Sequence, residues 1–270
     1  MGVACAVTAW PAGVAHAQSA PKFDYSLFNP TPRELRRPLS ADRPDSTESP
    51  YTVDAGAFQI EWSFIEWTHN RDDGETRRDT SIMPINFKVG LTNDLDVQVI
   101  LRPYEIVEGE PDAEGFGDLT VRVKLNLLGN DDGEFAAALL PFVTFPTGAD
   151  GVTTDRVEGG MIVPVAWSFA QGWNLGAQIG LERVRADLKY ETVLSHAMVI
   201  GRELTDSLGA YVEYLAECPV DGHGRYSPSL SLGATYAVSD DAQLDAGVVI
   251  GLDNPRTDDV RLFLGMTMRF

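Results

Sequence analysis

Several segments of about ten residues place an apolar side chain at every second position, and this alternation constrains the fold more than any other feature. Between residues 118 and 128, one face carries Leu119, Val121, Val123, Leu125 and Leu127, and the other carries Asp118, Thr120, Arg122, Lys124 and Asn126. A period of two predicts a β-strand. About ten residues is also the length that a tilted strand needs to cross a bilayer. The same alternation ends the chain, where the aromatic residue Phe270 is the last residue.

The alternation predicts about twelve strands, an even number that suits a barrel with both termini in the periplasm. Their expected spans are 57–68, 80–91, 95–104, 117–128, 134–146, 158–169, 173–184, 191–204, 208–217, 227–238, 242–252 and 259–270. Short links, such as 92–94 and 239–241, alternate with longer polar loops, such as 69–79 and 105–116. Short periplasmic turns and long extracellular loops are typical of outer-membrane barrels.

The polar face of these strands carries many charges. They are Asp96, Arg102, Asp118, Arg122, Lys124, Glu182, Glu213 and Asp245. Burying them in a dry core would cost several kcal/mol each unless they were paired. We therefore expect them to line a hydrated lumen and the apolar face to contact lipid. The predicted fold class is all-β, a transmembrane antiparallel up-and-down β-barrel of about 12 strands.

The chain is expected to have three parts. Residues 1–17 resemble a cleaved signal peptide with a small-residue site at Ala15-His16-Ala17, which implies export to the outer membrane. Residues 18–55 are proline-rich and read as an extended periplasmic arm, with disorder or folding back into the barrel as a partial plug as alternatives. Residues 56–270 form the barrel. Cys5 falls in the signal peptide and leaves Cys218 as the remaining cysteine, so no disulfide is expected.

The formal net charge of −19 disfavours nucleic-acid binding, because phosphate neutralisation needs clustered Lys and Arg. The expected partners are outer-membrane lipid, a small-molecule solute and the barrel-assembly machinery, which would read the carboxy-terminal strand with Phe270 as its signal. No cofactor and no metal are expected.

Two strands and three prolines fit the alternation less well. Spans 134–146 and 191–204 are apolar on both faces. Pro84, Pro141 and Pro164 lie within predicted strands, where each removes a ladder hydrogen bond, and mark either bulges or a gap in the wall.

Several stretches resemble a family of outer-membrane transporters named for members found with meta-pathway phenol degradation genes. The similar stretches are residues 39–61, 115–124, 140–148, 243–247 and 263–270. The run Asp42-Arg43-Pro44-Asp45, followed by Thr47-Glu48-Ser49-Pro50-Tyr51, is the most specific part. The resemblance implies an outer-membrane barrel that passes small molecules, aromatic ones included, and it supplies no catalytic or ligand residues.

These features favour a channel for passive uptake of small solutes, aromatic or hydrophobic compounds among them. One alternative is a non-conducting structural or surface-interaction barrel plugged by its arm. A barrel lipid hydrolase is disfavoured, because neighbouring Ser195 and His196 point to opposite faces of a strand and cannot pair. The acidic segment 105–114 is interpreted as a solvated loop, with divalent-cation binding as the alternative.

Overall fold

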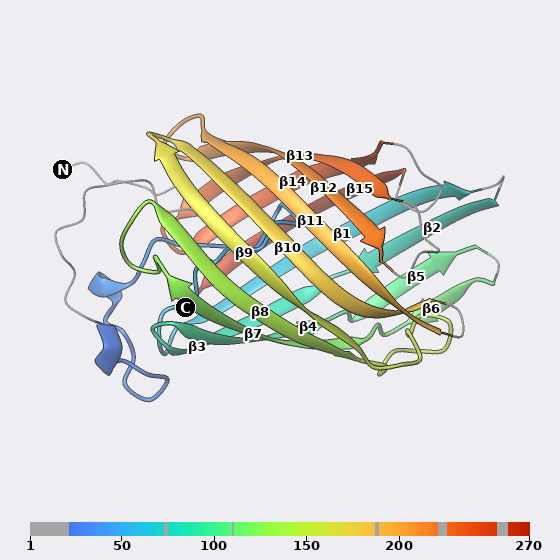
Figure 1. The fold of residues 1–270 in the computed structure, drawn as a ribbon, viewed down its shortest axis with the longest axis horizontal. Coiled ribbons are helices and arrows are strands. Elements are labelled where there is room, and N and C mark those ends of the chain that lie inside the picture. The colour runs from blue at the N-terminus through green and yellow to red at the C-terminus, as the bar shows by residue number, and fades with distance from the viewer. Residues whose placement is uncertain (1–21, 73–74, 110, 187–188, 221–225, 253–258) are drawn as a thin grey trace.

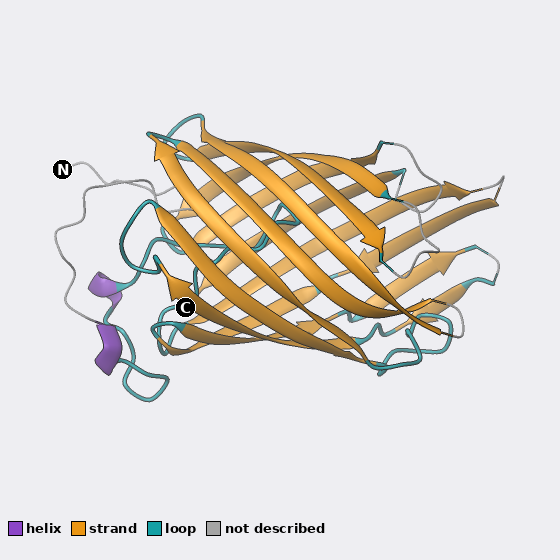
Figure 2. Ribbon diagram, in the orientation of Figure 1, coloured by secondary structure: helices purple, strands orange, loops and turns teal. Residues whose placement is uncertain are grey.

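The computed structural model describes residues 22–270, apart from residues 73–74, 110, 187–188, 221–225 and 253–258 (Figure 1). The signal peptide expected at residues 1–17 lies outside the described residues. The described chain is built almost entirely of strands that wrap around one axis (Figure 2). In this part of the chain, no helix is long and apolar enough to span a membrane.

The strands form a closed antiparallel β-barrel, as predicted. It has twelve strand positions around its circumference, and each position is here termed a stave. Closure comes from the first and last strands, which pair from Gln59↔Arg269 to His69↔Val260. The strand segments are β1 (Phe58–Asp72), β2 (Glu75–Ile82), β3 (Ile85–Thr92), β4 (Leu95–Leu101), β5 (Tyr104–Glu108), β6 (Ala113–Gly115), β7 (Leu119–Leu128), β8 (Phe135–Phe145), β9 (Glu158–Ala170), β10 (Trp173–Ala186), β11 (Lys189–Glu203), β12 (Leu208–Pro219), β13 (Ser227–Ser239), β14 (Ala242–Gly251) and β15 (Val260–Arg269).

Three staves are each broken into two segments, which is why fifteen segments make twelve staves. The continuous strand β1 pairs with β3 along its first half and with β2 along its second half. Between β2 and β3 lie Met83, which has a φ of 56°, and Pro84, which has no backbone N–H to donate. The breaks between β4 and β5, at Pro103, and between β6 and β7 follow at neighbouring positions around the barrel.

Strands extend further at the long-loop end than the sequence predicts. Segments 69–79 and 105–116, expected as loops, contribute to the paired strands β1–β2 and β5–β6. The reason is that these extensions stand beyond the apolar belt, where both faces are polar and the alternation disappears. The pair Asn70↔Arg77 is an example.

The barrel is inverted relative to a soluble one. Outward-facing apolar side chains are exposed, and they include Leu127, Ile179, Leu181, Met198, Leu262 and Leu264. Inward-facing polar side chains are buried, and they include Asp96, Gln98, Lys124, Glu213 and Asp245. Exposed apolar residues in a continuous band are the surface that lipid covers.

Aromatic rings mark the membrane boundary at the short-turn end. Trp167, Phe169 and Trp173 lie together there, with ring centroids 5.5 and 6.5 Å apart. Arg202 lies over the Trp173 ring at 4.5 Å. Phe270 ends the chain at this same end (Figure 1), with its side chain exposed. Such a girdle is expected at headgroup depth.

The prolines inside β8 and β9 interrupt ladders locally without opening the wall. Pairing of β7 with β8 passes from Arg122↔Phe142 to Leu125↔Leu139, and Pro141 lies within that interval. Pairing of β8 with β9 is interrupted beside Pro164 in the same way, from Ala137↔Val165 to Leu140↔Ile162. Because pairing resumes on both sides of each interval, these positions are ladder irregularities.

Candidate functional site

The candidate site is the segment that precedes β1. Residues 22–36, with the short 3-10 turns η1 (Lys22–Asp24) and η2 (Arg33–Leu35), lie beyond the short-turn end of the barrel (Figure 1). Residues 37–57, here termed the lumen loop, contact inward-facing side chains of strands all around the wall, from β3 and β7 to β12 and β14. The segment expected to be an extended periplasmic arm therefore fills the lumen over part of its length.

Asp42 forms the most highly charged contact of the lumen loop. Its carboxylate lies 2.6 Å from Lys124 Nζ, also pairs with Lys88, and lies 3.7 Å from the Arg122 guanidinium. Glu61 supplies a further carboxylate to Lys88 and accepts a hydrogen bond from the Asp42 backbone N–H. Burial raises the pKa of Asp42, but the ammonium groups of Lys124 and Lys88 outweigh it and hold that pKa well below its ordinary value.

Arg43 reaches a different part of the wall, on β14 and β1. Its Nη2 and Nε lie 2.8 and 3.2 Å from the two carboxylate oxygens of Asp245, a two-point arrangement. Nη1 donates to Ser63 Oγ at 2.7 Å. The guanidinium also lies 5.9 Å from the centroid of the Phe263 ring. Asp42 and Arg43 thus hold the loop between two sides of the wall with charges of opposite sign.

The deepest part of the loop, Asp45 to Glu48, binds the wall through backbone and side-chain groups. The Ser46 N–H donates to both Glu213 oxygens at 3.0 Å, and Thr47 Oγ1 donates at 2.7 Å. Glu48 pairs with Arg122, and its N–H donates to Gln178 Oε1 at 2.7 Å. One Asp45 oxygen, Oδ2, is buried and has no hydrogen-bond partner among the described residues. Burial, followed by the nearby Glu213 carboxylate, raises the pKa of Asp45 well above its ordinary value.

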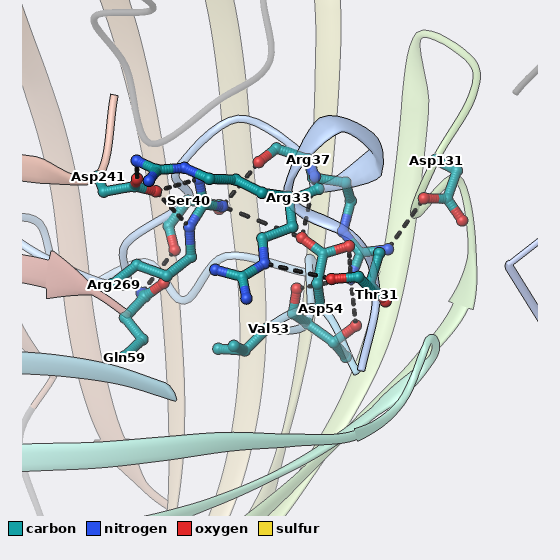
Figure 3. Close-up of polar contacts among 12 residues, drawn as sticks. Thr31, Arg33, Arg37, Ser40, Val53, Asp54, Gln59, Asp131, Asp241 and Arg269 are labelled. Atoms are coloured by element: carbon teal, nitrogen blue, oxygen red, sulfur yellow. Dashed lines mark hydrogen bonds and ion pairs between the residues drawn. The ribbon is translucent and has the colours of Figure 1, made fainter. Parts of the chain in front are cut away.

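The base of the loop is tied to periplasmic turns (Figure 3). Arg37 Nη1 donates to Asn93 Oδ1 at 2.8 Å and to Asp131 Oδ1 at 2.9 Å. Asp54 accepts from the Arg37 N–H at 2.9 Å and from Lys22 Nζ at 3.2 Å. Arg269 Nη1 donates to the Arg37 carbonyl at 2.6 Å. Both ends of the lumen loop are therefore fixed at the same end of the barrel.

One apolar contact accompanies these polar ones. Tyr51 is buried against Ala136 of β8 and Ala166 of β9, and Leu140 on the same inner face of β8 is fully buried. This contact explains why the span 134–146 is apolar on both faces: one face meets lipid and the other meets the loop. In β11, Val199 is likewise buried inside while Met198 and Ile200 are exposed outside.

Close packing is incomplete on one side of the loop. A small cavity separates Arg43, Pro44 and Asp45 from the inner faces of β10 to β13. The wall of the cavity includes the small residues Gly201, Gly209 and Ala210.

The predicted lumen-lining residues divide into two groups. Asp96, Arg122, Lys124, Glu213 and Asp245 all contact the lumen loop, and Asp96 accepts from the Val53 N–H at 3.0 Å. The other three lie away from it. Arg102 pairs with Glu105 at 3.4 Å, Asp118 accepts from the Gly148 and Thr154 N–H groups at 2.8 Å, and Glu182 lies near Glu158 and Glu217. A role in solute passage remains a prediction for all eight.

Sequence reasoning missed Lys88 and Glu61, which complete the Asp42 cluster. Folding back of residues 18–55 into the barrel was one of its alternatives, but without these contacts. Both residues lie on the inward face by simple alternation. The dense charges of residues 42–48 indicate that this segment needs charged partners, and Lys88 and Glu61 could have been sought among them.

Ser195 with His196 and the acidic segment 105–114 are the other groups that the sequence marks as candidates for chemistry. Ser195 lies beside lumen-facing Gly180, whereas the His196 ring packs outside against Tyr214 and Tyr226. In the acidic segment, Glu105 accepts from Ser81, Glu108 lies 3.9 Å from Arg78, and Asp112 accepts from the Gly109 N–H. Among the described residues, no group of His, Cys, Asp and Glu has a metal-binding arrangement.

The fold and the polar, loop-filled interior define the class: a transmembrane β-barrel of the bacterial outer membrane. The fold is shared by solved structures that include the following two. The COG4313 outer membrane channel from Pseudomonas putida F1 is 12% identical, with a TM-score of 0.66 over 86% of this chain and 100% of that one. The NanC porin is 10% identical, with a TM-score of 0.51 over 78% and 98%.

The chain belongs to the family described as "Putative MetA-pathway of phenol degradation", whose signature matches residues 41–262. This is the family that the run from Asp42 to Tyr51 resembles. No curated protein matches the chain.

Proposed function

We propose that this barrel is a passive outer-membrane channel for small solutes and that the lumen loop sets how far it opens. The observation that carries this proposal is the chemistry of the loop–wall interface. Arg43, Asp42 and Glu48 are held by ion pairs, and the Ser46 N–H is held by a carboxylate. Water can replace such contacts when the loop shifts, whereas a dry apolar seal would resist hydration.

The space around the loop supports the same proposal. The cavity beside Pro44 and Asp45 means that the loop is not close-packed against β10 to β13. The charged inner wall is suited to a water-filled pore. The names of the similar solved structures, an outer membrane channel and a porin, agree with this role.

For the solute class, we propose small compounds that include aromatic ones. The description of the family, which refers to phenol degradation, supports this choice. The mixed charges of the inner wall, Lys88 and Lys124 against Asp96 and Asp245, would let neutral polar molecules pass without a strong charge preference.

The test is single-channel conductance in planar bilayers, combined with solute flux into liposomes. The full chain is compared with a variant lacking residues 22–50, and folding of both is checked by heat-modifiable migration in gels. We expect small conductance from the full chain and larger conductance from the variant. Absence of conductance and flux from both folded proteins would contradict the proposal.

A second candidate, the non-conducting plugged barrel, is favoured by one observation. Where the loop contacts the wall, inward side chains such as Lys124, Gln98 and Glu213 are almost completely buried. In the same experiment, this candidate predicts conductance from the deletion variant and none from the full chain under any condition.

A further inference from the structure

The outer wall of β10 and β11 changes character toward the long-loop end. Its outward-facing neighbours Ile179↔His196 and Leu181↔Leu194 are followed by Arg183↔Thr192 and then Arg185↔Tyr190. Ile179 and Leu181 are each 52% exposed, as members of the lipid-facing belt. The row at Arg183 therefore stands where hydrocarbon gives way to the headgroups of the outer leaflet.

Cations gather at this level. We name Arg156, Arg183 and Arg185 the outer basic patch; Arg156 and Arg183 are exposed. The guanidinium groups of Arg156 and Arg183 lie 5.8 and 5.7 Å from the centroid of the same Tyr190 ring. Two cations on one aromatic ring are brought together against their mutual repulsion, which favours an anion as ligand.

The patch is held in place by the wall and by the loop between β8 and β9. Tyr190 OH donates to the Val157 carbonyl at 2.8 Å, and Arg183 Nη1 donates to Thr192 Oγ1 at 2.7 Å. Arg185 Nη1 donates to the Thr154 carbonyl at 2.9 Å and pairs with Asp155. The groups are thus preorganised, so binding costs less side-chain entropy.

Aromatic rings lie next to the patch on the same outer surface. His196 stacks with Tyr226 at 5.9 Å and lies 6.1 Å from the Tyr214 ring, while the two tyrosine hydroxyls are 2.7 Å apart. Rings with polar edges are suited to the boundary between sugar headgroups and acyl chains. Guanidinium groups above them are suited to phosphate oxygens.

We propose that this surface binds a phosphorylated glycolipid of the outer leaflet. Its phosphates contact Arg156 and Arg183, and its acyl chains lie along the belt of Ile179, Leu181 and Leu194, beside the Tyr226–His196 rings. Charge complementarity selects the phosphates. Continuity with the apolar belt favours a lipid rather than a free phosphate, because a free phosphate has no acyl chains to contact that belt. The proposal depends on the membrane position and not on solute transport.

The test uses the full-length protein in phosphatidylcholine nanodiscs, with binding measured by native mass spectrometry. The probes are bis-phosphorylated lipid A and its dephosphorylated form. The patch variant carries R156Q and R183Q. The matched control carries R77Q and R78Q, two exposed arginines of β2 that pair with Asp79 and Glu108 at the same end of the barrel.

We expect the wild type and the control to bind the phosphorylated lipid, and the patch variant to bind it roughly tenfold or more weakly. All three should bind the dephosphorylated lipid weakly. Equal binding of the phosphorylated lipid by the patch variant, once gel migration shows it is folded, would overturn the proposal. So would equal binding of both lipids by the wild type, or displacement of the lipid by inorganic phosphate alone.

Discussion

Arg43 in the lumen loop and Asp245 in β14 form a two-point ion pair inside the barrel, with Nη2 2.8 Å from Oδ1 and Nε 3.2 Å from Oδ2. The Asp245 side chain is fully buried, and that of Arg43 is 16% exposed. The pair fixes the loop to β14, apart from the strands that hold the Asp42 cluster, so its loss should free this part of the loop.

The variant R43Q should increase conductance and lengthen the open state. Removing one partner of a buried pair leaves the other charge uncompensated and typically costs about 3–5 kcal/mol. This cost destabilises the docked position of the loop relative to the displaced one. R33Q is the matched control, because Arg33 pairs with Asp241 while its own side chain is 78% exposed, beyond the end of the barrel. Conductance equal to the wild type in R43Q would show that the pair does not hold the loop.

Conductance should also depend on pH through Asp45. Because docking raises the pKa of this carboxyl, the docked loop holds the proton more tightly than the free loop does. The docked state is therefore favoured at low pH, and it loses this advantage as pH rises from about 3.9, the ordinary Asp value, through the raised pKa. Conductance should rise over the same window. D45N, which mimics the protonated form, should stay at low conductance across it, whereas an unchanged pH profile in D45N would refute the assignment.

Replacing Tyr51 should loosen the loop by a different route. Y51A removes the ring that covers Ala136 and Ala166, and loss of a buried aromatic ring typically costs about 3–5 kcal/mol. Y51F keeps the apolar ring and is the control. Limited proteolysis from the periplasmic side should cleave Y51A faster within residues 37–57. Similar cleavage rates for Y51A, Y51F and the wild type would mean that the ring adds little to docking.

Phe270 should matter for assembly more than for the finished barrel. Its N–H donates to the Phe58 carbonyl at 2.8 Å, so the backbone closes the seam whatever the side chain, and the ring itself is 56% exposed. F270S should lower the fraction of heat-modifiable barrel formed in cells while leaving the unfolding midpoint of the assembled fraction unchanged. A normal assembled fraction in F270S would remove Phe270 as the assembly signal.

The barrel was predictable because it depends on local pattern. Alternation between Asp118 and Leu128 fixes which face each side chain takes, and the alternating link lengths fix the direction of each strand. Breaks were harder to place. Pro84 predicts an irregularity within the span 80–91, but the division of one stave into β2 and β3 depends on β1 pairing continuously with both.

The site was predictable only in its wall residues. Alternation assigns Lys124 and Asp245 to the lumen but gives no information on what they meet there. Asp42 and Lys124 are 82 residues apart in the chain, and such a contact leaves no local periodicity. The inner face of β8 was ambiguous for the same reason, since Leu140 and Ala136 are apolar to suit Tyr51, which lies in another part of the sequence.

The path of the lumen loop has a topological consequence. The chain enters the pore near Arg37, turns at Ser46 and leaves near Asp54 through the same opening, directly before β1 begins. A hairpin of this kind needs no free end to be threaded, so it can withdraw and return while the β1–β15 seam stays closed. The two ends of the lumen loop, near Arg37 and Asp54, tether it to the barrel, because the end near Asp54 continues directly into β1. The obstruction is therefore covalently part of the pore it blocks, and each barrel carries its own copy at a fixed, high local concentration.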